Sequence, residues 1–199
     1  MIYNKQKHFK KAHKIVHLGV WISEDMSCDK NISEICKKAY PRVKMLTKLK
    51  YVGTSKEDLL QGYCMFIHSL TEYCSTAFHS SLSQRLSDKI ENIQKTCLRV
   101  ILDVMYVSYE AALEICGLQP LHMRCEHRSL QFVLTCINHP INRDMFPLNP
   151  TQDTHEIRHR EQFKVNKANT EYYRKSTIPY LQRRLNDYFL KMDSKGGGD

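Results

Sequence analysis

The sequence lacks the segments that mark membrane-spanning and secreted proteins. No stretch of the 199 residues is long and apolar enough to cross a bilayer. The first 11 residues carry four lysines and contain no apolar core like that of a secretion signal. These absences predict a soluble intracellular protein, nuclear or cytoplasmic, with no membrane partner.

Motifs for dedicated cofactor or disulfide chemistry are also missing. There is no Gly-x-Gly-x-x-Gly or Walker-type loop, so no nucleotide cofactor is expected. The eight cysteines form no Cys-x-x-Cys pair and are too widely spaced for a small disulfide scaffold. We therefore expect free thiols, most of them buried. They lie at positions 28, 36, 64, 74, 97, 116, 125 and 136.

One set of residues has the types that zinc prefers. His122 and Cys125 mirror Cys136 and His139, giving two His and two Cys. If residues 121–137 form one helix, the two halves lie about 20 Å apart and cannot share an ion. No metal site is therefore expected. A Cys–His nucleophile is not indicated either, since no cysteine has a local nucleophile signature.

The charge of the chain is concentrated at one end. The first 56 residues hold 13 Lys and Arg against 4 Asp and Glu, whereas the remaining residues hold 17 of each, so the whole net charge of +9 comes from the N-terminal part. Clustered cations gain affinity for polyanions by releasing counterions, which favours a nucleic-acid partner. A solvated surface helix is the alternative reading of such a charge run.

The distribution of apolar residues predicts a mainly α fold. Residues 15–22 are rich in β-branched and aromatic types and predict a strand or hairpin arm, with Gly19 marking a bulge or a close backbone approach. From about residue 29 the periodicity is helical. We expect a helical bundle preceded by a short β remnant, with a loosely structured C-terminal region. The predicted divisions are a flexible basic arm (1–14), the β remnant (15–28), the bundle (29–140), and a polar, partly helical region with a disordered tail (141–199).

The first predicted helix, residues 29–50, has two distinct sides. Its apolar residues fall in a narrow arc, and Lys30, Lys37, Lys44 and Lys48 fall within about 40° of one another on the opposite side. Together with Lys38 nearby, these lysines are the predicted phosphate contacts. Pro41 lies inside the helix and predicts a kink or a break into two helices.

Four further helices are expected, followed by one last helix near 178–189. One runs from Ser55 to about Ala77, and another covers residues 84–101. A short helix follows Ser108 and ends at Gly117, and a longer one runs from Pro120 to just before His139. The predicted buried face of the helix over 55–77 consists of Leu59, Tyr63, Phe66, Ile67, Leu70, Tyr73 and Cys74.

The order of several short motifs resembles a known family over residues 15–140, and more loosely through Tyr172 to Asn186. The motifs are Leu18-Gly19-Val20-Trp21-Ile22, Ile35-Cys36-Lys37-Lys38-Ala39, Leu46-Thr47-Lys48-Leu49, Ser69-Leu70-Thr71-Glu72-Tyr73-Cys74, Ile90-Glu91-Asn92-Ile93-Gln94-Lys95, Leu98-Arg99-Val100-Ile101, Tyr109-Glu110-Ala111-Ala112-Leu113 and Gly117-Leu118-Gln119-Pro120-Leu121. This order is similar to the C-terminal part of a jockey-like non-LTR retrotransposon reverse transcriptase. Phe78 and Pro41 depart from the family pattern.

The resemblance implies a thumb-like nucleic-acid-binding fragment of an RNA-directed DNA polymerase. The strand at 15–22 resembles the end of the palm, and the helices resemble the thumb, which holds the template and primer. Nucleotide transfer needs metal ions held by clustered aspartates, and this chain has no adjacent pair of aspartates. We therefore expect no polymerase activity from this chain alone, and a palm domain as a candidate partner. The alternative is a repurposed or functionless relic that self-associates through residues 15–22.

Overall fold

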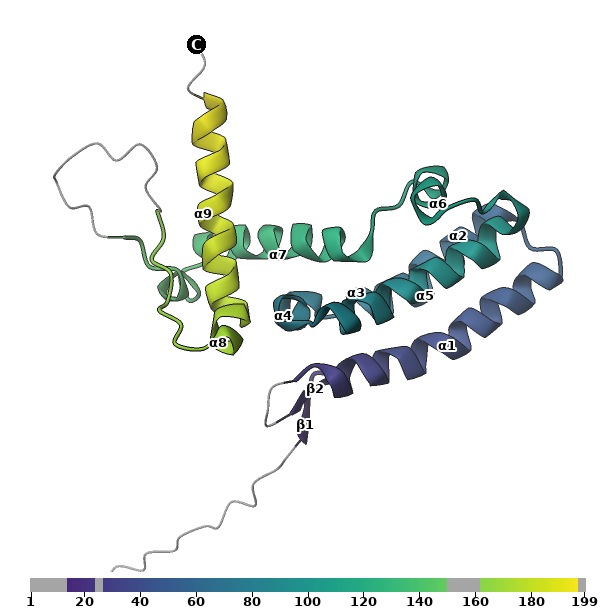
Figure 1. Cartoon of the computed structure of the whole chain (residues 1–199), viewed down its shortest axis with the longest axis horizontal. Coiled ribbons are helices and arrows are strands. Elements are labelled where there is room, and N and C mark those ends of the chain that lie inside the picture. Colours follow the sequence, from purple (N-terminus) through teal and green to yellow (C-terminus); the bar gives the residue numbers. More distant parts are fainter. Residues whose placement is uncertain (1–13, 24–26, 150–161, 197–199) are drawn as a thin grey trace, which may run out of the picture.

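The computed structural model describes residues 14–23, 27–149 and 162–196, and these are mainly helical. The predicted fold class, a helical bundle preceded by a short β element, is confirmed (Figure 1). The predicted basic arm lies almost entirely outside the described residues, as does the end of the predicted tail.

The β element is a two-stranded antiparallel hairpin. Strand β1 (Lys14–His17) pairs with β2 (Val20–Ser23), and Val16 lies opposite Trp21. Leu18 and Gly19 connect the strands with φ of 47° and 79°. Positive φ at both central positions is the pattern of a type I′ two-residue hairpin turn, so Gly19 serves the turn and not a bulge. The Tyr73 hydroxyl donates a hydrogen bond of 2.8 Å to the Leu18 carbonyl and ties this turn to the bundle.

Two long parallel helices form the body of the molecule. Helix α1 (Asp29–Tyr51) packs along α5 (Gln84–Leu102). Arg85 pairs with Asp29 where the two helices begin, and Lys50 lies 2.9 Å from the Asp103 carboxylate where they end. After α1 the chain runs back toward the start of α5 through α2 (Lys56–Tyr63), the π-helical segment η1 (Cys64–His68) and α3 (Ser69–Glu72). These segments follow one another without a gap, so the helix predicted over 55–77 is present but contains a π-helical turn and ends at Glu72 instead of about Ala77.

The π-helical turn changes which side of this segment is buried. Phe66 and Tyr73 are 61% and 52% exposed, so the predicted buried face is wrong at these positions. A π turn inserts an extra residue, which rotates the following side chains by one position. The next buried residues are accordingly His68, Thr71 and Glu72. The helix then ends, and Cys74 adopts a left-handed conformation with φ of 54°.

Short elements flank α5 and lead to a third long helix. Helix α4 (Ser75–Phe78) and the 3-10 turn η2 (His79–Ser81) precede α5, and the 3-10 turn η3 (Asp103–Met105) follows it. Helix α6 (Tyr109–Cys116) is capped by the Ser108 side chain and ends at Gly117 with φ of 63°, as predicted. Helix α7 (Leu121–Asn138) follows Pro120 and ends before His139, also as predicted.

Helix α7 connects two hydrophobic cores. Its N-terminal half contributes Leu121 to the main core among α1, α2, α5 and α6. Its C-terminal half contributes Val133 and Cys136 to a smaller core with Phe146, Phe163, Leu181 and Leu185. Leu181 and Leu185 belong to α9 (Thr177–Gly196), whereas the 3-10 turn η4 (Arg143–Met145) directly precedes Phe146 and the short helix α8 (Glu171–Lys175) precedes α9.

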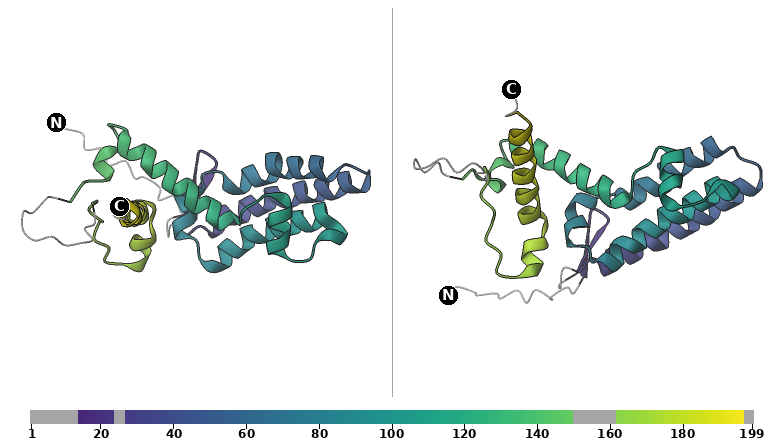
Figure 2. Two further views of the ribbon diagram at one scale, coloured as in Figure 1. Left: turned by 90° about the horizontal axis from the view of Figure 1, so that it is seen from above. Right: turned by 45° about the horizontal axis from the view of Figure 1, so that its top comes forward.

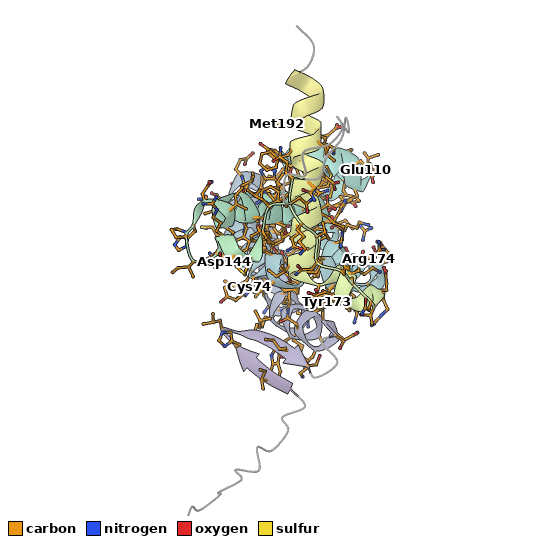
Figure 3. All side chains as sticks on the ribbon, turned by 90° about the vertical axis from the view of Figure 1, so that its left-hand side faces the viewer. Cys74, Glu110, Asp144, Tyr173, Arg174 and Met192 are labelled. Atoms are coloured by element: carbon orange, nitrogen blue, oxygen red, sulfur yellow. The ribbon has the colours of Figure 1, made fainter. Side chains whose placement is uncertain are left out.

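Helix α9 runs across α7 at one end of the molecule, and the C-terminal ends of α1 and α5 lie at the other (Figures 1 and 2). Seen from the end that carries α9, the hairpin lies below the helices (Figure 3).

Candidate nucleic-acid interface

Helix α1 buries its apolar side and leaves its lysine side in solvent. Ile32, Ala39 and Leu46 are almost fully buried, whereas Lys37 and Lys44 are exposed. The helix is rigidly seated because α5 and the α2–α3 return both pack against its apolar side. The structure therefore presents the predicted lysine side as an outward surface.

The five predicted lysines differ in their partners. Lys30 and Lys37 lie 2.8 and 2.9 Å from the same Glu34 oxygen. Hydrogen bonds from these two ammonium groups hold the pKa of Glu34 at about 2, and the Lys30 ammonium also lies 5.0 Å from the centre of the Trp21 ring. In the described part of the chain, Lys38, Lys44 and Lys48 have no carboxylate within 4.0 Å. Part of the charge on Lys30 and Lys37 is thus already balanced.

Four of the five lysines share one side of α1, and Lys38 does not. Lys30, Lys37, Lys44 and Lys48 repeat at spacings of seven or four residues, which keeps them on one side. Lys38 is rotated from Lys37 by about 100°. It lines a pocket beside the hairpin turn, with Leu18, Gly19, Leu70 and Tyr73 among the other lining residues.

Helix α5 adds cations next to this surface that the sequence analysis left out. Arg85 pairs with Asp29 of α1. Burial raises the pKa of the Cys36 thiol on α1, and the positive charge of Lys89 nearby opposes this rise. Arg99 lies farther along the exposed side of α5, 5.3 Å from the Tyr106 ring. The helical repeat places these cations off the apolar side of α5, but it cannot show that α5 runs beside α1 in the same direction.

Pro41 does not divide α1 into two helices, so of the two outcomes predicted for it, a kink or a break, the break is wrong. The helix is continuous from Asp29 to Tyr51 with Pro41 inside it. Proline removes the backbone donor that would bond the Lys37 carbonyl. Because Pro41 lies on the exposed side, water can satisfy that carbonyl, and buried apolar contacts on both sides of Pro41 keep the helix continuous.

A buried polar network fixes the position of α7. The Tyr63 hydroxyl donates a 2.6 Å hydrogen bond to Gln94, whose amide donates to Tyr109 and to the Gln119 carbonyl. Glu91 accepts hydrogen bonds from Tyr109 and, at 3.1 Å, from the Leu121 backbone N–H. A carboxylate at the first N–H groups of a helix caps it and matches its dipole. A helical repeat alone cannot reveal this role, because Glu91 and Gln94 read as polar residues beside the apolar positions.

A second buried carboxylate joins α3 to α7. One oxygen of the Glu72 carboxylate accepts a hydrogen bond from the Arg124 guanidinium. Arg128 lies 2.8 Å from the other oxygen. His68 lies 2.9 Å from the same oxygen as Arg124 but outside hydrogen-bonding geometry. Burial alone would raise the pKa of Glu72, yet the contacts with His68 and Arg124 outweigh burial and lower it to about 2. Glu72 is therefore ionised and paired at neutral pH.

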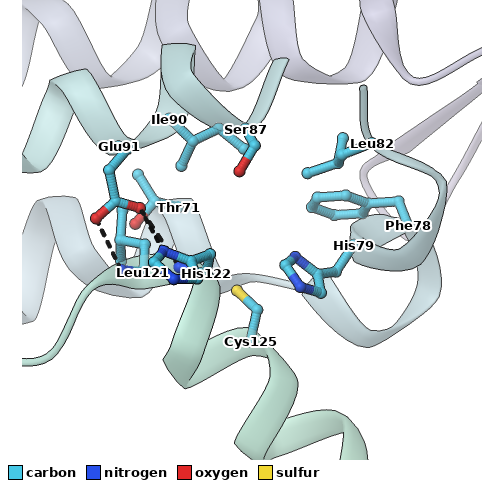
Figure 4. A pocket seen from close by; sticks show the side chains of 10 residues that line it. All are labelled: Thr71, Phe78, His79, Leu82, Ser87, Ile90, Glu91, Leu121, His122 and Cys125. Atoms are coloured by element: carbon cyan, nitrogen blue, oxygen red, sulfur yellow. Dashed lines mark hydrogen bonds and ion pairs between the residues drawn. The ribbon is translucent and has the colours of Figure 1, made fainter. Parts of the chain in front are cut away.

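The histidines and cysteines do not assemble a catalytic or metal centre within the described residues. His79, His122 and Cys125 line one small pocket, which has room for roughly one water molecule (Figure 4). Burial raises the pKa of Cys125 and lowers that of His79, which disfavours a thiolate–imidazolium pair. Between residues 14 and 196, outside the two undescribed gaps, no three His, Cys, Asp or Glu side chains gather as metal ligands. All eight cysteines are free.

No known protein family, curated protein or solved structure matches this chain. No helix in the described ranges is long and apolar enough to cross a membrane.

Proposed function

We propose that this chain is a non-catalytic nucleic-acid-binding fragment, comparable to the thumb of a retrotransposon reverse transcriptase. It grips the backbone of RNA, DNA or a hybrid through α1, inside the cell, and a palm domain is its candidate protein partner. The observation that carries the proposal is the outward lysine side of α1, on which Lys44 and Lys48 are exposed and have no carboxylate partner in the described part of the chain.

The expected binding is electrostatic and largely independent of base sequence. Phosphate contacts position a protein on nucleic acid and carry little sequence information. Each lysine that neutralises a phosphate contributes about 0.7 to 0.9 to the slope of log affinity against log salt concentration. The absence of paired aspartates fits a gripping role and not nucleotide transfer.

A salt titration with matched variants tests this proposal. Binding of a labelled RNA–DNA hybrid is measured by fluorescence anisotropy between about 50 and 200 mM salt. The Lys44→Gln/Lys48→Gln variant should bind more weakly and lose about 1.4 to 1.8 from the slope. The control is Lys164→Gln/Lys167→Gln, which removes the same charge from exposed positions outside α1. Equal losses in both variants, or a folded wild-type chain that does not bind, would refute the proposal.

A thermal melt gives an independent measurement. A ligand that binds only the folded protein raises the unfolding midpoint. Circular dichroism at the helix band should therefore show a cooperative melt that moves upward with added hybrid. A cooperative melt that does not move counts against nucleic-acid binding.

Self-association through the hairpin is a second candidate function, favoured by a specific observation. Val16 and Leu18 are 53% and 74% exposed, and among the described residues β1 and β2 pair only with each other. Open strand edges with apolar side chains can pair with another copy. Analytical ultracentrifugation should then show concentration-dependent dimers that Val16→Lys abolishes. Val104→Lys, at an exposed position distant in sequence, is the control. A monomer at all concentrations refutes this candidate.

A further inference from the structure

Two tyrosines are interleaved with the lysines on the exposed side of α1. Lys37, Tyr40, Lys44, Lys48 and Tyr51 follow one another at spacings of three or four residues, and all five are exposed. Such spacing places them along one stripe of the helix surface. We call these five residues the lysine–tyrosine stripe.

The tyrosines are not part of the folding core. Tyr40 and Tyr51 are 48% and 84% exposed, whereas the apolar residues of α1 are buried on the other side of the helix. They lie 11 residues apart, which corresponds to about three turns and about 16 Å along the helix. Single exposed aromatic residues are common on protein surfaces. Two aromatic rings set among three cations on one stripe of a helix are more specific.

We propose that the lysine–tyrosine stripe binds a single-stranded segment of nucleic acid, with unpaired bases stacked on Tyr40 and Tyr51. The inference rests on the proposed function and names its substrate class. Grooves that bind single strands combine cations that follow the backbone with aromatic rings on which bases stack. In a duplex the base faces are covered by their neighbours, so a helix following the backbone offers its tyrosines nothing to stack on.

An anionic membrane is the other polyanionic surface, and the structure disfavours it. A helix that binds a membrane surface inserts an apolar side into the lipid. The apolar side of α1 is already buried against α5 and the α2–α3 return. The outward side offers tyrosines separated by lysines, which suits stacked bases with phosphates between them.

The test measures the affinity of the full chain for a 15-nucleotide single strand and for a self-complementary oligonucleotide duplex of the same charge. Both affinities are measured by fluorescence anisotropy. Tyr40→Ala and Tyr51→Ala should each weaken single-strand binding about tenfold, because one stacked base contributes on that order. Both variants should leave duplex binding and the salt slope unchanged, and Tyr40→Phe should retain single-strand affinity because it keeps the ring. Phe132→Ala is the control, since Phe132 is 49% exposed on α7. Circular dichroism melts confirm that each variant is folded.

The outcomes separate this inference from the proposed function. If the lysine variants lose binding but the alanine variants behave like Phe132→Ala, the chain grips nucleic acid without stacking and the inference is overturned. Equal loss on single strand and duplex also overturns it. If neither nucleic acid binds, both proposals fall. Competition by vesicles containing phosphatidylserine, with no effect of vesicles lacking it, would assign the stripe to a membrane instead.

Discussion

At the scale of single residues, Glu72 is the charge on which the junction of α3 and α7 depends. Its side chain is 3% exposed and faces Arg124, Arg128 and His68. The pKa of Glu72 lies near 2 in the folded protein, against an ordinary value of 4.5. Its contribution to stability is therefore fully present above about pH 4.5 and is lost as the pH falls toward 2.

Replacing this carboxylate should lower stability in a pH-dependent way. A pKa difference of this size corresponds to about 3 kcal/mol, so Glu72→Gln should lower the free energy of unfolding by about that much at pH 7. Urea unfolding at pH 7 and pH 3 measures the difference between variant and wild type, which should shrink by about half at the lower pH. Glu34→Gln is the control, because Glu34 has a similarly low pKa but lies at the surface, where solvent screens its ion pairs. A pH-independent difference would contradict this account.

The sequence could not single out Glu72. Its partner Arg124 is 52 residues away along the chain, and both residues read as ordinary polar positions on helices. The lysines of α1 were found because one helix carries them all, so the helical repeat alone places them together. Residues whose roles depend on contacts between distant helices, such as Glu72, Glu91 and Lys89, carry no comparable local signal.

At the scale of elements, the apolar repeat predicted the long helices well and local backbone irregularities poorly. The buried sides of α1 and α5 follow the three-and-four spacing read from the sequence. The π-helical turn at 64–68 has no residue signature of its own and arises where the return segment packs against α1 and α5. At Pro41 the sequence carries a strong local signal for a kink or a break, yet the helix continues through it because tertiary packing holds α1 together.

Restoring the missing hydrogen bond in α1 should stabilise the protein. Proline in a helix interior costs up to about 3 kcal/mol, and part of the gain on removal is offset because the unfolded chain becomes more flexible. Pro41→Ala should therefore raise the free energy of unfolding by about 1 to 2 kcal/mol. Ser33→Ala, which improves helix propensity elsewhere in α1 without restoring a backbone donor, should raise it by a few tenths. A loss of stability in Pro41→Ala would mean that the proline relieves strain in α1.

At the scale of the whole molecule, α7 joins two cores of unequal size. The main core contains residues from α1 through α7, whereas the smaller one has six buried members around α7 and α9. The sequence showed the last helix but not its core, because the partners Phe146 and Phe163 lie in irregular segments without periodicity. Polar contacts also link the two parts, including one of 2.9 Å from the Thr177 hydroxyl to the Ala77 carbonyl.

The smaller core should open without unfolding the main one, because α9 contacts the bundle at α7, α4 and η2, whereas most contacts of α1 and α5 lie within the main core. Leu185 is fully buried, and Leu185→Ala should cost about 2 to 5 kcal/mol. Hydrogen exchange should then speed up in α9 and the C-terminal half of α7, while α1 and α5 stay protected and nucleic-acid binding by α1 is unchanged. Ile93→Ala, at a fully buried position of α5, should instead speed exchange throughout the bundle. Equal deprotection of α5 in both variants would show that the two cores unfold as one cooperative unit.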